Sequence, residues 1–154
     1  MDVVTTELDE RLLRLHVRGA DGSLDPERAV WTACDLLVAG LDTPALCELA
    51  GESPTRLEAG DAAALVRQVV VELGLKPMTH DEANWFLGRE AARKIVAGAP
   101  RAEWEGATWR ITIEVNDDED GVFWALARYD TDPEPFLGYV RQYLERAEEQ
   151  LTRW

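Results

Sequence analysis

Hydrophobic residues recur every three or four positions over most of the first hundred residues of the chain. Leu8, Leu12 and Leu15 follow this spacing with charged residues between them, and Gly19 comes shortly after. A stripe of this kind, followed by a glycine that can take a left-handed conformation, is typical of an amphipathic helix and its end. We therefore predict a helix over residues 6–18.

Capping residues mark the starts of three further helices. Asp25 precedes Pro26, Thr43 precedes Pro44, and Thr79 lies three residues before Glu82. A short polar side chain before a first-turn proline favours a helix start, and the third spacing is that of a capping box. The expected buried face of the helix from Pro26, with Trp31 beside it, is Val30, Cys34, Leu37, Val38 and Leu41.

The widest apolar face of the N-terminal half lies between Asp61 and Gly74. It follows a run of alanines, which favour helix, and ends at a glycine. We expect a central, deeply buried helix whose apolar face consists of Leu65, Val66, Val69, Val70 and Leu73.

The periodicity changes after Pro100. Trp109, Ile111, Ile113 and Val115 alternate with polar residues, which predicts a half-buried strand. The acidic tract 116–121 predicts a turn, and 122–127 a return strand, so these segments together predict an antiparallel hairpin. A closing helix is expected from residue 136. The predicted fold class is α+β: one domain, 1–154, with five or six helices and one hairpin before the C-terminal helix, divided into a helical part (1–100) and a hairpin-plus-helix part (101–154).

Charge limits the classes of partner. The 154 residues include 16 Lys and Arg against 30 Asp and Glu, so the net charge is −14, while 46% hydrophobic residues support a globular core. Such a surface repels nucleic acid and anionic lipid and attracts a basic protein. The sequence has no apolar run of about 18 residues and no signal peptide, which predicts a cytoplasmic protein. Arginine far outnumbers lysine, a bias typical of GC-rich bacterial genomes.

Residues suited to catalysis or to metal binding do not form a recognisable motif. Cys34 and Cys47 both lie in apolar stretches, where we expect buried free thiols. The tract from Asn116 to Gly121 matches the start of an EF-hand calcium loop, but Ala127 stands where that loop needs a glutamate. We therefore predict no catalytic residue, no metal site and no cofactor.

These observations favour a non-enzymatic protein-binding module, of the immunity-protein or inhibitor type, that masks a basic partner. One alternative is a small enzyme or accessory subunit with a carboxylate-lined pocket, for example Glu114 with Asp130 or Asp132. Another is a self-associating structural subunit, a homodimer in which two hairpin edges pair.

The candidate binding residues fall into two acidic groups and one aromatic anchor. With strand geometry the hairpin separates the two groups by roughly 20 Å. Trp104 is expected to be exposed in a polar loop at the same end as the second group. The predicted residues are Asp117, Asp118, Glu119 and Asp120 at the hairpin tip, Asp130, Asp132 and Glu134 in the following loop, and Trp104.

Overall fold

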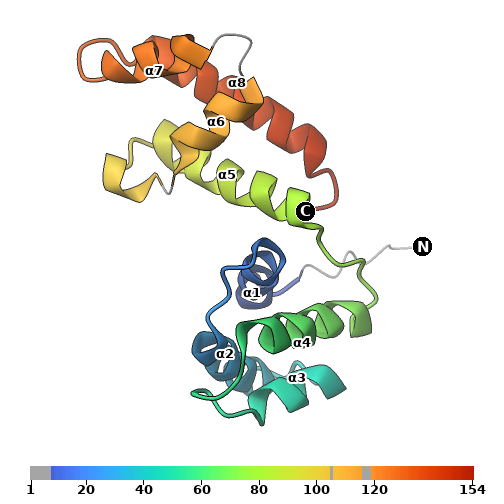
Figure 1. Ribbon diagram of the computed structural model, residues 1–154. Helices are drawn as coiled ribbons and strands as arrows, with labels where there is room; N and C mark the ends of the chain where they lie inside the picture. Colours follow the sequence, from blue (N-terminus) through green and yellow to red (C-terminus); the bar gives the residue numbers. More distant parts are fainter. Residues whose placement is uncertain (1–7, 105, 116–118) are drawn as a thin grey trace. The chain divides into compact units, whose positions relative to one another are not determined.

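The computed structural model describes residues 8–104, 106–115 and 119–154, including their side chains except those of Glu119 and Asp120. These residues form helices and connections only, without a β-strand (Figure 1). The chain divides into two compact units, Met1–Ala83 and Asn84–Trp154. None of the described helices combines the length and the hydropathy needed to cross a lipid bilayer.

The N-terminal unit contains α1 (Glu10–Asp21), α2 (Pro26–Val38), α3 (Pro44–Ala50) and α4 (Ala59–Glu72). The predicted caps are confirmed at two of these starts. Asp25 accepts a hydrogen bond from the backbone N–H of Glu27, and Thr43 Oγ1 accepts one from Leu46 N–H at 3.2 Å. Local capping therefore sets where α2 and α3 begin.

The core of the N-terminal unit is built around α4, which packs against α1, α2 and α3. Val66, Val69 and Val70 are fully buried, which confirms the predicted apolar face, whereas Leu65 and Leu73 are partly buried at its edge. The core residues are Leu12, Leu15, Leu24, Ala29, Val30, Ala33, Leu36, Ala45, Leu46, Leu49, Ala62, Val66 and Val69.

The predicted buried face of α2 was wrong in part. The helix buries Ala29, Val30, Ala33 and Leu36, while Val38 is 90% exposed. The two alanines share the side facing the core, and their small side chains let the neighbouring helices approach closely. Trp31 is exposed as a result.

The predicted burial of the cysteines is not observed either. Both thiols are free, but Cys34 is only partly buried and Cys47 is exposed.

The C-terminal unit is formed by most of α5 (His80–Val96), the short 3-10 helix η1 (Arg101–Glu103), α6 (Ala107–Val115), α7 (Glu119–Ala127) and α8 (Glu134–Gln150). The predicted capping box before α5 is confirmed. Thr79 N–H donates to Glu82 Oε1 at 3.3 Å, and Glu82 N–H donates to Thr79 Oγ1 at 3.1 Å. Helices α6 and α7 pack against each other, and both pack against α8.

The predicted hairpin, and with it the α+β fold class, is wrong, because both of its strands are helices. The alternating pattern of residues 108–115 also fits a helix. Ala107, Ile111 and Val115 are four residues apart and buried, whereas Trp109 and Ile113 lie four residues apart on the exposed side. A helix with apolar residues on two sides imitates strand alternation, and its packing against α8 overrides the strand preference of its branched side chains.

Candidate protein-binding surface

Trp104, the predicted exposed anchor, is buried and belongs to an aromatic cluster inside the C-terminal unit. Its indole Nε1–H donates to the carbonyl oxygen of Ala99 at 2.8 Å. Its ring stacks on Phe136 with centroids 5.6 Å apart, and it meets Tyr129 edge to face at 5.4 Å. With 5% of its surface exposed, Trp104 packs the start of α8 and is not accessible as an anchor.

The acidic loop before α8 is exposed, and two of its three predicted residues face arginines. Asp130 Oδ1 lies 3.5 Å from an Arg101 guanidinium nitrogen, and Glu134 Oε2 lies 3.5 Å from one of Arg141. Asp132 is also exposed. Exposed ion pairs of this kind contribute little to stability, but the arginines reduce the negative charge that the loop offers a basic partner.

Only half of the other acidic group lies within the described residues. Asp117 and Asp118 lie outside the described residues, whereas Glu119 and Asp120 form the beginning of α7. Because the hairpin does not exist, the strand-based separation of about 20 Å between the two groups has no basis. Pairing of hairpin edges in a homodimer is ruled out for the same reason in the segments described as α6 and α7.

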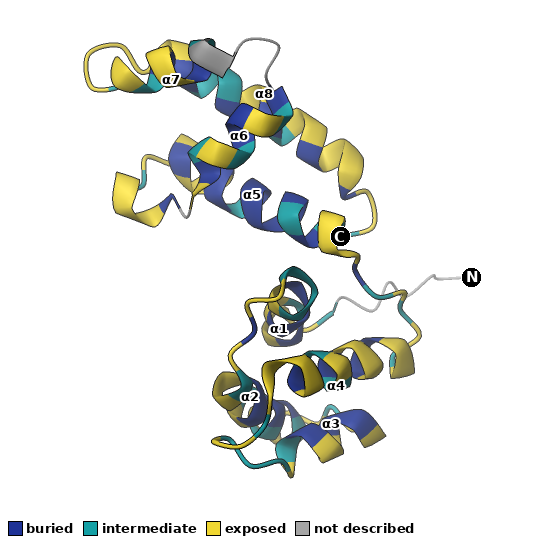
Figure 2. Ribbon diagram, in the orientation of Figure 1, coloured by how far each residue is buried: buried dark blue, intermediate teal, exposed yellow. Residues whose placement is uncertain are grey.

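Parts of α6 and α7 are exposed (Figure 2), and several of the exposed residues have large apolar side chains. Trp109 and Ile113 of α6 are 65% and 56% exposed, and Phe123 and Trp124 of α7 are 48% and 67% exposed. We call these four residues the aromatic surface. Half of the large hydrophobic residues exposed in the described part of the chain belong to it.

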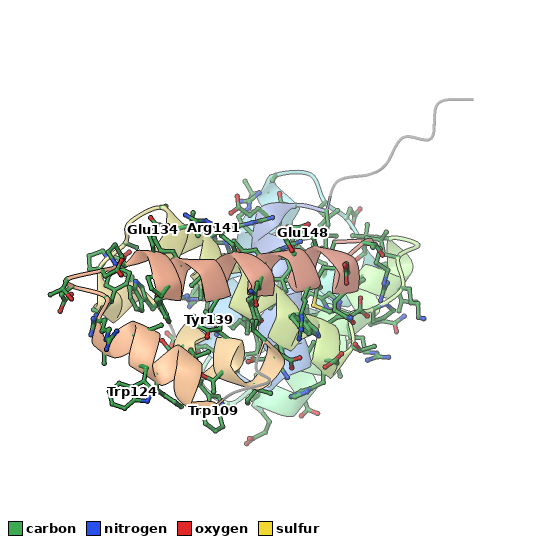
Figure 3. The ribbon with its side chains drawn as sticks, turned by 90° about the horizontal axis from the view of Figure 1, so that it is seen from above. Trp109, Trp124, Glu134, Tyr139, Arg141 and Glu148 are labelled. Carbon is green, nitrogen blue, oxygen red and sulfur yellow. The ribbon has the colours of Figure 1, made fainter. Side chains whose placement is uncertain are left out.

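The two tryptophans of the aromatic surface point to one side of the C-terminal unit. In Figure 3, Trp109 and Trp124 project from α6 and α7 away from α8. The opposite sides of these helices are occupied by packing, since Ile111, Val115 and Val122 are buried. A tryptophan that is two-thirds exposed leaves a large apolar ring in water, and a contiguous apolar patch typically marks an interaction site.

Contacts with α8 and within α6 hold the aromatic surface in place. The Arg146 guanidinium of α8 donates a hydrogen bond to the carbonyl oxygen of Glu114 in the last turn of α6. Within α6, Thr112 Oγ1 donates to the carbonyl oxygen of Thr108 at 2.8 Å. Because the end of α6 is fixed to a longer helix, the aromatic surface is preorganised in the free chain, which lowers the entropic cost of binding.

Sequence reasoning missed this surface because it assigned Trp109 and Trp124 to packing faces of strands. The signal that could have revealed it is the four-residue spacing of Ala107, Ile111 and Val115. With that row taken as the buried side of a helix, Trp109 and Ile113 have to face away from the core.

The alternative of a carboxylate-lined enzyme pocket has a possible location in a cleft of the N-terminal unit. A cleft of about 410 Å³ between α3 and α4 is lined by four carboxylates and one arginine, namely Glu48, Glu52, Glu58, Asp61 and Arg56. All four carboxylates are at least partly open to water, whereas catalytic acids and bases are usually tuned by burial. Of the residues suggested by the sequence, Asp130 faces Arg101 and Asp132 is exposed.

Comparison of the chain with protein-family models, with curated proteins and with solved structures gives no match.

Proposed function

We propose that this chain is a non-enzymatic protein-binding module and that its aromatic surface binds a basic partner protein. The observation that carries the proposal is the exposure of Trp109 and Trp124 on one side of α6 and α7. Tryptophan is enriched among the residues that dominate protein interfaces, because it buries a large rigid area on binding. Masking a basic partner, as an inhibitor or an immunity protein does, is the role that fits this surface.

Charge supports a basic partner over a second copy of the chain. The C-terminal unit carries 14 Asp and Glu against 9 Lys and Arg within residues 84–154, and the whole chain has a net charge of −14. Two copies would repel each other, as would nucleic acid or an anionic membrane. A basic protein would instead be steered towards this surface, and its binding would weaken as salt is added.

The proposal can be tested with two designed helical peptides that share a leucine face. One peptide has lysines flanking this face, and the other has glutamates at the same positions. Binding is measured by fluorescence anisotropy of a labelled peptide against the whole chain. We expect the lysine-flanked peptide to bind, and the double variant Trp109→Ser/Trp124→Ser to weaken it about tenfold or more, as loss of interface hot spots does.

The matched control is Trp31→Ser, because Trp31 is 58% exposed on α2 in the other unit. This variant should bind the lysine-flanked peptide like the parent chain. The proposal fails if the parent binds neither peptide, if the glutamate-flanked peptide binds as tightly, or if Trp31→Ser weakens binding as much as the double variant.

A further inference from the structure

A pocket of about 210 Å³ lies between α1 and α4 in the N-terminal unit, beside the segment that precedes α5. Each of the two helices contributes residues three and four positions apart, which share one side of a helix. The lining residues are His16, Gly19 and Ala20 of α1, Ala63, Ala64 and Arg67 of α4, and Met78 of the segment before α5.

The pocket exists because small residues stand where the two helices meet. A Cβ atom at position 19 would lie 3.4 Å from Cβ of Ala63, so the helices approach closely at Gly19. Beside this contact, the side chains of Ala20 and Ala64 are too short to fill the remaining space. A cavity of about 150 Å³ is enough to hold benzene in a protein interior. The pocket therefore has room for one small ring or a short carbon chain together with a polar group.

Two buried residues that are bonded to each other form the inner wall of the pocket. His16 is 3% exposed and Met78 is 1% exposed, and Nε2 of the histidine accepts a hydrogen bond from the backbone N–H of Met78 at 2.7 Å. A ring nitrogen that accepts a hydrogen bond carries no proton, so this imidazole is neutral. The inner wall is therefore uncharged and ordered in advance, which lowers the cost of binding a ligand there.

Arg67 is the one charged side chain among the described residues that line the pocket, and it is exposed. Its neighbours three and four positions away on α4 are Ala63, Ala64, Val70 and Val71, so its own helix offers it no carboxylate. It forms no ion pair within the part of the chain that the structure describes. The pocket is therefore lined by a positive charge, in contrast to the cleft between α3 and α4 with its four carboxylates.

We propose that this pocket binds a small monocarboxylate, whose carboxylate pairs with Arg67 and whose apolar part lies against the alanines and Met78. A guanidinium can donate two parallel hydrogen bonds to one carboxylate, which gives both affinity and orientation. One arginine balances one negative charge, and the net charge of −14 on the chain repels a doubly charged anion more strongly. The site lies in the unit that does not carry the aromatic surface, and it is independent of the proposed function.

The experiment uses benzoate as the probe and benzamide, which has the same ring without the charge, as its neutral counterpart. Each compound is titrated into the ¹⁵N-labelled whole chain at constant ionic strength, and the amide signals of Gly19 and Met78 are followed by NMR. Benzoate should shift these signals to saturation with a Kd of about 1 mM or less, and it should bind at least about fivefold more tightly than benzamide. In Arg67→Gln this advantage should disappear. In Ala20→Leu, where a larger side chain fills the pocket, benzoate should bind at least about fivefold more weakly.

The matched control is Arg56→Gln, which removes the same charge from an exposed arginine of the same unit that lines the cleft between α3 and α4. This variant should bind benzoate like the parent chain. The proposal is overturned if the benzoate shifts do not saturate, if Arg67→Gln binds benzoate as tightly as the parent chain, or if inorganic phosphate binds as tightly as benzoate. Equal losses of affinity in Arg56→Gln and Arg67→Gln would also overturn it.

Discussion

The hydroxyl group of Tyr143 on α8 lies against the backbone of Gly88 in the middle of α5. A Cβ atom at position 88 would overlap this hydroxyl oxygen and lie 2.7 Å from Cζ of the ring. The tyrosine is 1% exposed, and its ring centroid is 5.2 Å from that of Trp85. Glycine costs a helix about 1 kcal/mol relative to alanine, so its presence here is explained by the close approach of α8.

Replacing Gly88 with alanine should therefore destabilise the chain, although alanine is the better helix former. We expect a loss of about 1–3 kcal/mol in the free energy of unfolding, as overpacking usually causes. The control is Gly138→Ala on α8, where an added Cβ meets no atom within 4 Å and should stabilise by up to about 1 kcal/mol. Urea denaturation of both variants is the measurement. A stabilising Gly88→Ala would contradict the contact.

The stability of the chain should fall at alkaline pH because of Tyr143. Burial raises the pKa of its phenol to about 12, with Glu114 acting in the same direction and Arg110 against it. The unfolded chain releases this proton near pH 10. The contribution of Tyr143 to the free energy of unfolding is therefore intact below pH 10 and is lost as the pH rises from about 10 to 12. The loss reaches about 1 kcal/mol at pH 11.

The measurement for this prediction is the free energy of unfolding at pH 8 and pH 11 for the parent and for Tyr143→Phe. Other alkaline titrations are common to both proteins, so their difference isolates the buried phenol. The variant should lose less stability between the two pH values. An equal loss in both proteins would show that Tyr143 is not the cause.

A buried histidine fixes the segment before α5. His16 Nε2 accepts a hydrogen bond from the backbone N–H of Met78 at 2.7 Å, and both residues are almost fully buried. His16→Ala should leave this N–H without its acceptor and cost about 2–3 kcal/mol, with faster hydrogen exchange at Met78. The exposed His80 provides the control, and His80→Ala should change stability by less than about 0.5 kcal/mol. Unchanged protection of the Met78 amide in His16→Ala would contradict this role.

One carboxylate of α8 forms ion pairs with two arginines of α5. Glu148 lies 2.8 Å from Arg93 and 3.7 Å from Arg89, whose side chain is only 7% exposed. Burial lowers the pKa of Arg89, and the neighbouring Arg93 adds to this effect. Since the removal of one partner leaves a buried charge uncompensated, we expect Glu148→Gln to cost about 1–2 kcal/mol, less than for a fully buried pair.

The matched control for this ion pair is Glu149→Gln, which removes the same charge from the next, exposed residue of α8. It should change the free energy of unfolding by less than about 0.5 kcal/mol. Equal effects of the two variants in thermal denaturation would show that the contacts of Glu148 with Arg89 and Arg93 do not stabilise the chain.

The parts of the fold that could be predicted from the sequence depend on local interactions. The starts of α2, α3 and α5 follow from hydrogen bonds between residues two or three positions apart, such as that between Thr43 and Leu46. The burial of Val69 follows from a wide apolar face that only a helix can produce.

The parts that could not be predicted depend on contacts between distant residues. The segment 107–115 fits both periodicities, and it becomes helical where α8 packs against it. Trp104 is buried because Phe136, far along the chain, stacks on its ring. The sequence therefore did not reveal the aromatic surface, and the buried Trp104 was predicted as the binding anchor instead.

The central claim is that Trp109 and Trp124 form an exposed binding surface, and indole N–H signals in a two-dimensional ¹H–¹⁵N NMR spectrum test it most directly. The chain has six tryptophans, and each gives one indole signal that a Trp→Phe variant can assign. On addition of the lysine-flanked peptide, the signals of Trp109 and Trp124 should shift while those of Trp31 and Trp104 stay in place. Shifts at Trp31 with none at Trp109 and Trp124 would contradict the claim.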